Sequence, residues 1–430
     1  MAFIDVGATP SAAAVGTDTA MPVEVAVPTL FCPQNDEAEP LLSIVIPALN
    51  EEIAIGQFMD WCHAGIAAAG IRAEVLIIDS SRDRTAAIAL ENGARVLKTP
   101  KRGLGRAYID AIPFIRGRYV LMGDADCTYD FRRIDGFVEQ FEAGAEFIMG
   151  SRFRGTIEDG AMPPLHRYFG TPLTTAILNL MYGTRFTDIH CGMRGLTADA
   201  LRRMGLASQS WEYASEMVLK SVHMELATAE VPVTFCKDMA GRVSHHVRAG
   251  WFSPWQAGWI NLRAMFVYGA DFFLTMPGAL LLLLGLMVMI PLATGPIMLG
   301  GVTLALNSML AGMVSAMVGL QMILLGGIAR CLYDQQGRHR RKWISLFRYT
   351  RTCLICAGLF AAGLVPVCIL VRDYVANGFL ITPALEGVDH AALFGVFLML
   401  GAVLIFVSML VMQAVALYVP RSGGQSDLDR

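Results

Sequence analysis

The sequence contains little charge and few of the patterns that charge usually forms. Only 17% of its 430 residues are charged and 54% are hydrophobic, which is too apolar for an ordinary soluble protein. It has no tract of lysine and arginine, and a net charge of −3 gives no reason to expect nucleic acid as a partner. Long apolar runs begin only near residue 270. We therefore expect a soluble domain followed by an apolar one.

Cysteine patterns typical of metal sites or disulfide frameworks are also missing. The nine cysteines are scattered, and the CxxC spacing of Cys353 and Cys356 falls inside an apolar run without a second pair. We interpret these two as packing residues and the others as reduced thiols of a cytosolic domain.

The first 40 residues have no basic segment followed by an apolar core, so they are not typical of a signal peptide. They are rich in Ala, Thr, Pro and Val. We expect residues 1–40 to be a disordered extension and residues 41–249 to be the soluble domain.

Four apolar runs are long enough to cross a bilayer, at residues 274–292, 302–328, 353–371 and 391–418. One or two of them could instead be buried helices of a soluble core, but the absence of charge inside all four disfavours this. We predict a four-span domain over residues 274–420, followed by a short tail.

The loops between these runs predict which side of the membrane each part faces. Before the third run lie seven basic residues and one acid, whereas the next loop has one basic residue and three acids. The basic residues are Arg330, Arg338, Arg340, Arg341, Lys342, Arg348 and Arg351. Basic loops face the cytoplasm, so the soluble domain and the tail at residues 421–430 are also expected there, on an inner (plasma) membrane.

Before the apolar runs, short apolar strands alternate with helix-like segments. The stretches "SIVIP", "EVLIID", "ARVLK" and "RYVLM" are typical of strands. Alternation of this kind predicts an α/β fold with a mainly parallel sheet flanked by helices.

Polar residues follow each of these strands, at Asn50–Glu51, Asp79–Ser81, Arg102–Gly105 and Asp124–Asp126. Ligands of parallel sheets bind beyond the carboxyl ends of the strands. A single such feature could be a helix cap, and the glycines at 103 and 105 lack the third glycine of a dinucleotide fingerprint. Because polar residues recur at four strand ends, we predict that they line one polar crevice.

Asp124 and Asp126 are two residues apart, so on an extended backbone their side chains point the same way. Carboxylate oxygens without histidine or cysteine nearby favour Mg²⁺ or Mn²⁺, which usually keep positions open for phosphate oxygens. Such a metal can neutralise a departing diphosphate. The alternative is a solvated turn that happens to carry two acids.

Five stretches resemble, in order, the motifs of family-two glycosyltransferases with the GT-A nucleotide-sugar fold: "SIVIPALNEE", "LIIDSSRDRT", "RGLGRAY", "MGDADCTYDF" and "MGSRF". "DIHCGMRG", "EYASEMVLK" and "AEVPVTF" resemble its polyprenyl-phosphate branch, which includes dolichol-phosphate mannose synthase and bacterial dolichol-phosphate-glucose-type synthases. The resemblance covers about residues 41–270. It implies transfer of a hexose, with inversion, from a UDP- or GDP-sugar to undecaprenyl or dolichyl phosphate.

The resemblance also implies a nucleotide site. Pro47, Asn50 and Glu51 would line it, and Asp79 would contact the base or the ribose. The usual acid before Asp79 and the usual glycine after it are replaced by isoleucine and serine, so base recognition departs from the family pattern. Arg102 and Gly103, at the next strand end, complete the expected substrate-binding set on this side.

For the catalytic centre, the resemblance implies that Asp124 and Asp126 hold the metal and the diphosphate. Arg152 would face a substrate phosphate, and Glu216 would lie near the transferred sugar. A lipid monophosphate is largely dianionic at neutral pH, with a second pKa of about 6, so the acceptor needs no general base.

The basic "GxSKL" element of the family corresponds to residues 241–246 here, "GRVSHH". It implies Arg242 as the residue that binds the acceptor phosphate, with Arg248 as the alternative and Ser244 as a further contact. The two histidines in this stretch could also meet phosphate, although a surface histidine pair usually has no such role.

Two stretches could touch the membrane. Residues 250–273 carry three tryptophans and a tyrosine just before the first apolar run, which is typical of an interfacial helix, and residues 163–183 are apolar but interrupted. Core packing is the alternative for both. Such a bundle could also form homo-oligomers.

Two other functions are compatible with this organisation. A processive polysaccharide or glycolipid synthase would need a Gln-x-x-Arg-Trp motif, and the nearest stretch, "RRKW" at 340–343, lacks the glutamine. A non-catalytic scaffold or flippase component is disfavoured by the intact Asp124–Asp126 pair and by the uncharged spans.

Overall fold

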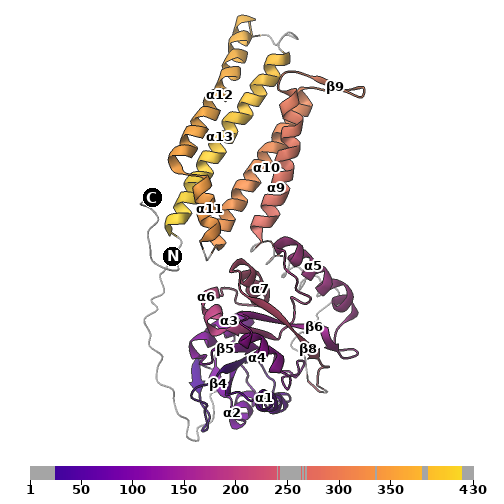
Figure 1. Cartoon of the computed structure of the whole chain (residues 1–430), viewed down its shortest axis with the longest axis vertical. Coiled ribbons are helices and arrows are strands. Elements are labelled where there is room, and N and C mark those ends of the chain that lie inside the picture. The colour runs from indigo at the N-terminus through magenta and orange to yellow at the C-terminus, as the bar shows by residue number, and fades with distance from the viewer. Residues whose placement is uncertain are drawn as a thin grey trace. The chain divides into compact units, whose positions relative to one another are not determined.

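The computed structural model describes residues 25–239, 241–242, 263, 266, 269–334, 337–379 and 386–418. The chain forms two compact units, Met1–Met265 and Phe266–Arg430 (Figure 1).

The first unit is built on an eight-stranded sheet in the order β1-β4-β3-β2-β5-β7-β6-β8. Strands β2, β3, β4 and β5 run parallel, as do β6 and β8, whereas β1 and β7 pair antiparallel with their neighbours. The predicted mainly parallel sheet is confirmed. The strands are β1 (Thr29–Phe31), β2 (Leu42–Ala48), β3 (Ala73–Asp79), β4 (Arg95–Lys98), β5 (Tyr119–Met122), β6 (Phe147–Ile157), β7 (Arg194–Thr197) and β8 (Thr228–Phe235).

Helices cover the sheet (Figure 1) because its central strands are apolar on both faces. Ile44 of β2, Leu76 of β3 and Leu121 of β5 are fully buried. The helical elements of the unit are α1 (Ile55–Ala69), α2 (Thr85–Glu91), α3 (Leu104–Ala111), η1 (Ile112–Phe114), α4 (Asp135–Glu142), η2 (His166–Gly170), α5 (Thr171–Tyr182), α6 (Ala198–Met204) and α7 (Tyr213–His223).

The predicted disordered extension is wrong for its last part. Residues 29–31 form β1, which pairs antiparallel with β4, and Asp36 forms an ion pair with Arg116 at 2.5 Å. Cross-strand pairing supplies order that the composition of this segment does not indicate. Residues 1–24 lie outside the described part of the chain.

A buried carboxylate joins three parts of the sheet. Glu74 on β3 is 4% exposed and accepts hydrogen bonds from Ser43 Oγ at 2.5 Å, Arg95 Nη1 at 2.7 Å and Arg116 Nε at 2.9 Å. Arg95 is itself buried, and Glu74 is the nearer of its two acidic partners, the other being Asp36 at 3.8 Å. Buried ion pairs of this kind become costly when one member is removed.

Within its described residues, the second unit contains four helices that are long and apolar enough to cross a membrane, by length and composition. They are α9 (Ala270–Leu292), α10 (Leu306–Tyr333), α12 (Tyr349–Ala376) and α13 (Glu386–Tyr418). The four predicted apolar helices are thereby confirmed. A short helix α11 (Arg338–Leu346) joins α10 to α12.

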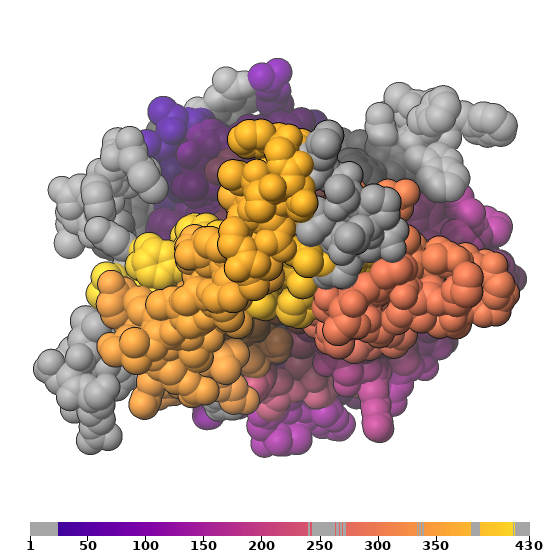
Figure 2. Space-filling model, turned by 90° about the horizontal axis from the view of Figure 1, so that it is seen from above, coloured from indigo at the N-terminus to yellow at the C-terminus, as the bar shows by residue number. Residues whose placement is uncertain are grey.

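Two predicted boundaries change. The first helix begins at Ala270 rather than at residue 274, and the second begins at Leu306 rather than at residue 302. The intervening residues form a hairpin, β9 (Ile297–Leu299) and β10 (Val302–Leu304), because Gly300 and Gly301 adopt positive φ. The hairpin projects from the ends of α9 and α10 (Figures 1 and 2).

Glycines allow the helices of this unit to pack closely in pairs. A Cβ at Gly285 of α9 would lie 2.5 Å from the Gly312 carbonyl of α10, and a Cβ at Gly363 of α12 would lie 2.4 Å from the Gly395 carbonyl of α13. Small residues at such crossings are typical of helices that associate within membranes.

We predict that Glu74→Gln lowers the midpoint of thermal unfolding by roughly 5–10 °C, because it leaves the buried Arg95 with only the more distant carboxylate of Asp36, 3.8 Å from its Nε, as a counter-charge. Differential scanning fluorimetry of the full chain in detergent measures this. Glu139→Gln, at an exposed position on α4, is the matched control. Equal midpoints for the two variants would contradict the role given to Glu74.

Candidate active site at the strand ends

The loops after β2 and β3 are joined by hydrogen bonds. Asn50 has a left-handed backbone with φ of 52°, and it donates its N–H to Ser81 Oγ at 2.7 Å. Its side-chain oxygen accepts the N–H of Arg82 at 3.0 Å, and Glu51 donates its N–H to Thr85 Oγ1 at 2.8 Å. The first two predicted strand-end groups therefore form one continuous rim.

Asp79 is fully buried at the end of β3. Its Oδ2 accepts from Lys98 Nζ at 2.5 Å and from the N–H of Ser81 at 3.2 Å, and its Oδ1 is buried with no hydrogen-bond partner in the described part of the chain. A contact with base or ribose would fall to Oδ1 and stays a prediction. Pro47, half-buried, lies opposite Ile78 in the sheet register.

Asp124 and Asp126 follow β5 at the same edge of the sheet. Asp126 Oδ1 accepts from the N–H and the Oγ1 of Thr128, at 3.0 and 2.6 Å. Its Oδ2 lies 3.3 Å from Nη2 of Arg242. A Cβ at Gly192 would lie 2.7 Å from Asp124 Oδ2, so only glycine allows the chain to pass this close.

Arg242 bridges two of the predicted site acids. Its Nε and Nη2 each donate to the carboxylate of Glu51 at 2.6 Å, and Nη2 also faces Asp126. Hydrogen bonding to Glu51, together with Asp126, raises the pKa of Arg242 above its usual value. The structure thus brings Arg242 into the site, whereas Ser244, Arg248 and the neighbouring histidines lie outside the described residues.

The acids of this site need a cation. Burial raises the pKa of Asp124 to about 7, and the neighbouring charge of Asp126 adds to this rise. Arg194, Arg242 and Arg152 lower it again. Two close carboxylates in a poorly solvated place therefore depend on positive charge around them.

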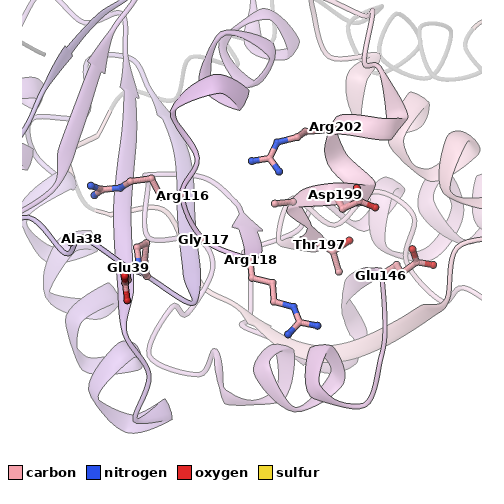
Figure 3. Close-up of a pocket in the computed structure, with 11 residues that line it drawn as sticks. Ala38, Glu39, Arg116, Gly117, Arg118, Glu146, Thr197, Asp199 and Arg202 are labelled. Carbon is pink, nitrogen blue, oxygen red and sulfur yellow. The ribbon is translucent and has the colours of Figure 1, made fainter. Parts of the chain in front are cut away.

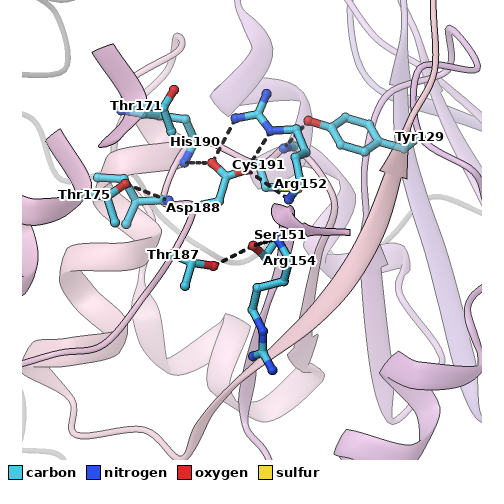
Figure 4. A network of polar contacts seen from close by, with 12 residues as sticks. Tyr129, Ser151, Arg152, Arg154, Thr171, Thr175, Thr187, Asp188, His190 and Cys191 are labelled. Atoms are coloured by element: carbon cyan, nitrogen blue, oxygen red, sulfur yellow. Dashed lines mark hydrogen bonds and ion pairs between the residues drawn. The ribbon is translucent and has the colours of Figure 1, made fainter. Parts of the chain in front are cut away.

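Arg152 lies on β6 in a fixed position. Its Nε and Nη2 donate to the two oxygens of Asp188 at 2.7 and 2.9 Å (Figure 4). Its guanidinium lies over the Phe235 ring at 5.2 Å. Burial works against its charge, but Tyr129 and Asp188 raise the pKa of Arg152 above its usual value. The two hydrogen bonds to Asp188 fix the orientation of the guanidinium, and the contact of Arg152 with a substrate phosphate stays a prediction.

A polar network links Arg152 to α5 (Figure 4). Asp188 Oδ1 accepts the N–H of His190 at 3.2 Å, and His190 Nε2 is bonded to Thr174 Oγ1 at 2.8 Å. Ile189 donates its N–H to Thr175 Oγ1 at 3.5 Å. Burial lowers the pKa of His190 to about 4, so this imidazole is neutral near pH 7.

Glu216 occupies a different kind of position from the one the resemblance implies. Its fully buried carboxylate accepts the N–H groups of Ala207 and Ser208, at 2.9 and 2.8 Å, and pairs with Lys220 at 2.7 Å. Although burial opposes ionisation, these partners lower the pKa of Glu216. The geometry favours a residue that positions the loop before α7, and its predicted contact with the sugar stays untested.

That loop packs against the third predicted strand end. Gly103 has φ of 113°, and a Cβ there would lie 2.3 Å from the Gln209 carbonyl, which also accepts the N–H of Arg106 at 3.0 Å. Arg102 donates to Asp110 at 2.8 Å and is partly exposed. The glycine at position 103 is therefore explained by the close approach of another backbone segment and by its positive φ, which favours glycine.

Sequence reasoning missed three charged residues of the site. Asp188 and Arg194 lie within "DIHCGMRG", which was noted for its resemblance but not assigned by residue, and Lys98 ends β4. Arg194 is 1% exposed and donates to the carbonyls of Ile189, Cys191 and Ala214. The available signal in the sequence was a charged residue on a strand that is otherwise buried, which could have indicated a residue of the site.

A cavity of about 660 Å³ lies at the other end of β5, away from Asp124 (Figure 3). It holds none of the predicted site residues. Its lining residues are Ala38, Glu39, Pro40, Arg116, Gly117, Arg118, Glu146, Thr197, Ala198, Asp199 and Arg202. Within the described ranges, no group of three His, Cys, Asp or Glu side chains could hold a metal by itself.

We predict that the free energy of unfolding falls as the pH drops from about 6.5 towards 4, because the unfolded chain protonates His190 and the folded one does not. Above about pH 7.5 this contribution is constant. His190→Gln should lose less stability than the wild type between pH 7.5 and pH 5, measured by thermal unfolding at each pH. The exposed His63→Gln is the control, and equal losses in both variants would refute the assignment.

Comparison with known proteins identifies the family. The family model for glycosyl transferase family 2 matches residues 43–205. The low-salt glycan biosynthesis hexosyltransferase Agl6 of Haloferax volcanii is 36% identical over 308 residues, which are 71% of this chain and 72% of that protein. A dolichyl-phosphate hexose transferase of the same organism is 29% identical, covering 49% of this chain and 88% of its own length.

Among solved structures, mannosyl-3-phosphoglycerate synthase from Rubrobacter xylanophilus aligns with a TM-score of 0.41 at 22% identity, over 52% of this chain and 72% of that one. The family match and the long alignment with Agl6 agree with the motifs at the strand ends. The chain belongs to glycosyltransferase family 2 and is a glycosyltransferase.

Proposed function

We propose that this glycosyltransferase moves a hexose from a UDP- or GDP-sugar to a membrane polyprenyl phosphate, undecaprenyl or dolichyl phosphate, with a divalent metal and with inversion. The observation that carries the proposal is the meeting of acids and arginines at the carboxyl end of β5. Asp124 and Asp126 can serve a cation, and Arg152 and Arg242 can serve phosphate. A sugar nucleotide and a lipid phosphate together need both the cation at the acids and the arginines for phosphate.

The residues present fit Mg²⁺ or Mn²⁺. These ions are often held by one or two carboxylates and completed by water and substrate phosphates. Asp126 Oδ1 is engaged by Thr128, so its Oδ2, now facing Arg242, is the oxygen that it can offer together with the carboxylate of Asp124. When bound, the metal would neutralise charge on the departing diphosphate.

The arginines supply what a dianionic acceptor requires. Asp188 engages Nε and Nη2 of Arg152, which fixes the guanidinium beside the acids and leaves Nη1 for a phosphate oxygen. Arg242 carries a charge that Glu51 and Asp126 share. With two anionic substrates aligned in this way, positioning and electrostatics supply the catalysis and no general base is needed.

Two features favour a lipid acceptor. The first unit exposes large apolar side chains around η2 and α5, and the second unit contains four apolar helices. The exposed residues are Leu165 at 54%, Tyr168 at 73%, Phe169 at 59%, Leu173 at 45% and Leu180 at 78%. An apolar patch of this kind on a chain that carries membrane helices is typical of a surface that lies on the bilayer.

The name of the second Haloferax relative, a dolichyl-phosphate hexose transferase, supports the same class of acceptor. The basic loop between α10 and α12 supports a cytoplasmic active site through the positive-inside rule. The interfacial helix proposed for residues 250–273 lies mostly outside the described part of the chain.

We predict that Asp126→Asn lowers transfer of labelled hexose to polyprenyl phosphate by at least about 100-fold, because it removes a metal ligand and half of the acid pair. Membranes that hold the protein are incubated with undecaprenyl or dolichyl phosphate and a panel of UDP- and GDP-sugars. Chelation should abolish transfer, and Mg²⁺ or Mn²⁺ should restore it.

Asp135→Asn, an exposed change in the first turn of α4, is the matched control and should keep full activity. Transfer that survives in Asp126→Asn would refute the assigned site. Long polymeric products in place of a single-sugar lipid would favour a processive synthase, and absence of transfer from every donor would favour a scaffold.

We further predict that replacing Tyr168, Phe169 and Leu180 by serine raises KM for polyprenyl phosphate by about tenfold, because less apolar surface meets the bilayer. KM for the sugar nucleotide should not change. Steady-state kinetics in liposomes test this, with Val27→Ser, 66% exposed, as the control. Equal effects on both substrates would show that the patch has another role.

A further inference from the structure

The second unit carries a dense group of cations outside the active site. Arg341 and Lys342 on α11 and Arg348 and Arg351 at the start of α12 are all exposed. None of the four has a carboxylate partner in the part of the chain that the structure describes. We refer to these four residues as the α11 basic surface.

The helix that carries two of these cations is held firmly. A Cβ at Gly327 of α10 would lie 2.7 Å from the ring of Trp343, which stacks on Phe347 with centroids 5.9 Å apart. The Phe347 carbonyl accepts from Gln413 Nε2 at 3.2 Å. The inner side of α11 is therefore pinned to α10 and α13, which leaves its cations on a fixed outer side.

The acid nearest in sequence to α11 is already used. Asp334 is 6% exposed, and its two oxygens accept the N–H groups of Gly337 at 2.9 Å and Arg340 at 2.7 Å. In addition, Nη1 of Arg340 is buried with no hydrogen-bond partner among the described residues. This end of the unit has more donors and positive charge than it has acceptors.

The position of two cations increases the imbalance. Arg348 is the N-cap of α12 and Arg351 lies in its first turn, where no acidic residue is present. Cations near a helix N-terminus are unfavourable, since the macrodipole is positive there. An anion from outside the chain would offset both the dipole and the unpaired charges.

We propose that the α11 basic surface binds the phosphate headgroups of anionic bilayer phospholipids. The surface adjoins apolar helices that could span the membrane, and clusters of four or more basic residues next to such a helix attract anionic lipid. The four side chains are exposed rather than gathered around a cavity, so the surface suits several headgroups better than one enclosed ligand. This proposal does not depend on the acceptor assigned to the active site.

The test compares lipid selectivity of the full chain in phosphatidylcholine bilayers. Spin-labelled phosphatidylglycerol and spin-labelled phosphatidylcholine are added in trace amounts, and the immobilised fraction of each is measured. The wild type should favour phosphatidylglycerol at least about threefold, and this preference should fall towards one at 1 M salt.

Replacing all four residues of the surface by glutamine should remove the preference while the number of immobilised phosphatidylcholine molecules stays the same. The lysine variant R341K/R348K/R351K keeps the charge and should keep the preference. The control exchanges four exposed arginines of the first unit for glutamine: Arg72, Arg84, Arg133 and Arg202.

A wild type without preference for phosphatidylglycerol would overturn the proposal, as would a preference that survives in the four-glutamine variant. The salt experiment uses unchanged protein, so the proposal can be refuted even if a variant fails to fold. Loss of hexose transfer in a separate assay has no bearing on this result.

Discussion

Two like charges at the end of a buried strand are the constraint on which the rest of this site depends. Burial raises the pKa of Asp124 to about 7, and repulsion by the neighbouring Asp126 adds to this rise. The structure offsets this with three arginines that arrive from different parts of the chain. The acids and the arginines therefore cannot be considered separately. In the proposed function, a metal ion would supply part of this positive charge at the acids, and substrate phosphates would bind beside the arginines.

The strand-end acids were predictable because each signal was local. A strand followed by polar residues needs only a short window of sequence, and four such windows at parallel strands must meet at one edge. The roles of Asp188, Arg194 and Lys98 were not predictable in this way. Asp188 and Lys98 act through partners distant in sequence, Arg152 and Asp79. Arg194 joins two nearby carbonyls to the more distant carbonyl of Ala214. Pairing across the sheet likewise orders β1, and the composition of its segment did not indicate a strand there.

Glu216 is a residue for which the structure adds a role that the motif did not indicate. Its carboxylate is buried against the amides of Ala207 and Ser208 and against Lys220, and the contact with sugar that the resemblance implies stays a prediction. The loop it holds packs on Gly103, whose positive φ and close approach to Gln209 permit no side chain. A buried acid and a glycine at a strand end thus maintain one rim of the crevice together. Residues within a functional motif can therefore hold the shape of a site, whether or not they also touch the substrate.

The pairing of Arg242 with Glu51 and Asp126 bears directly on the proposed reaction. An acid pair permanently closed by arginine would have no capacity for a metal, but the pairing seen here is uneven. Arg242 lies 2.6 Å from both oxygens of Glu51 and 3.3 Å from one oxygen of Asp126. Glu51 alone can hold the guanidinium by two hydrogen bonds, so Asp126 can be released without stranding a buried charge. When Asp126 is released from Arg242 in this way, Arg242 stays in the site, still charged and next to the acids. A cation bound at Asp126 would leave Arg242 with less negative charge beside it, and a phosphate bound at Arg242 would compensate for this loss. Binding of the cation and binding of the phosphate would therefore favour each other.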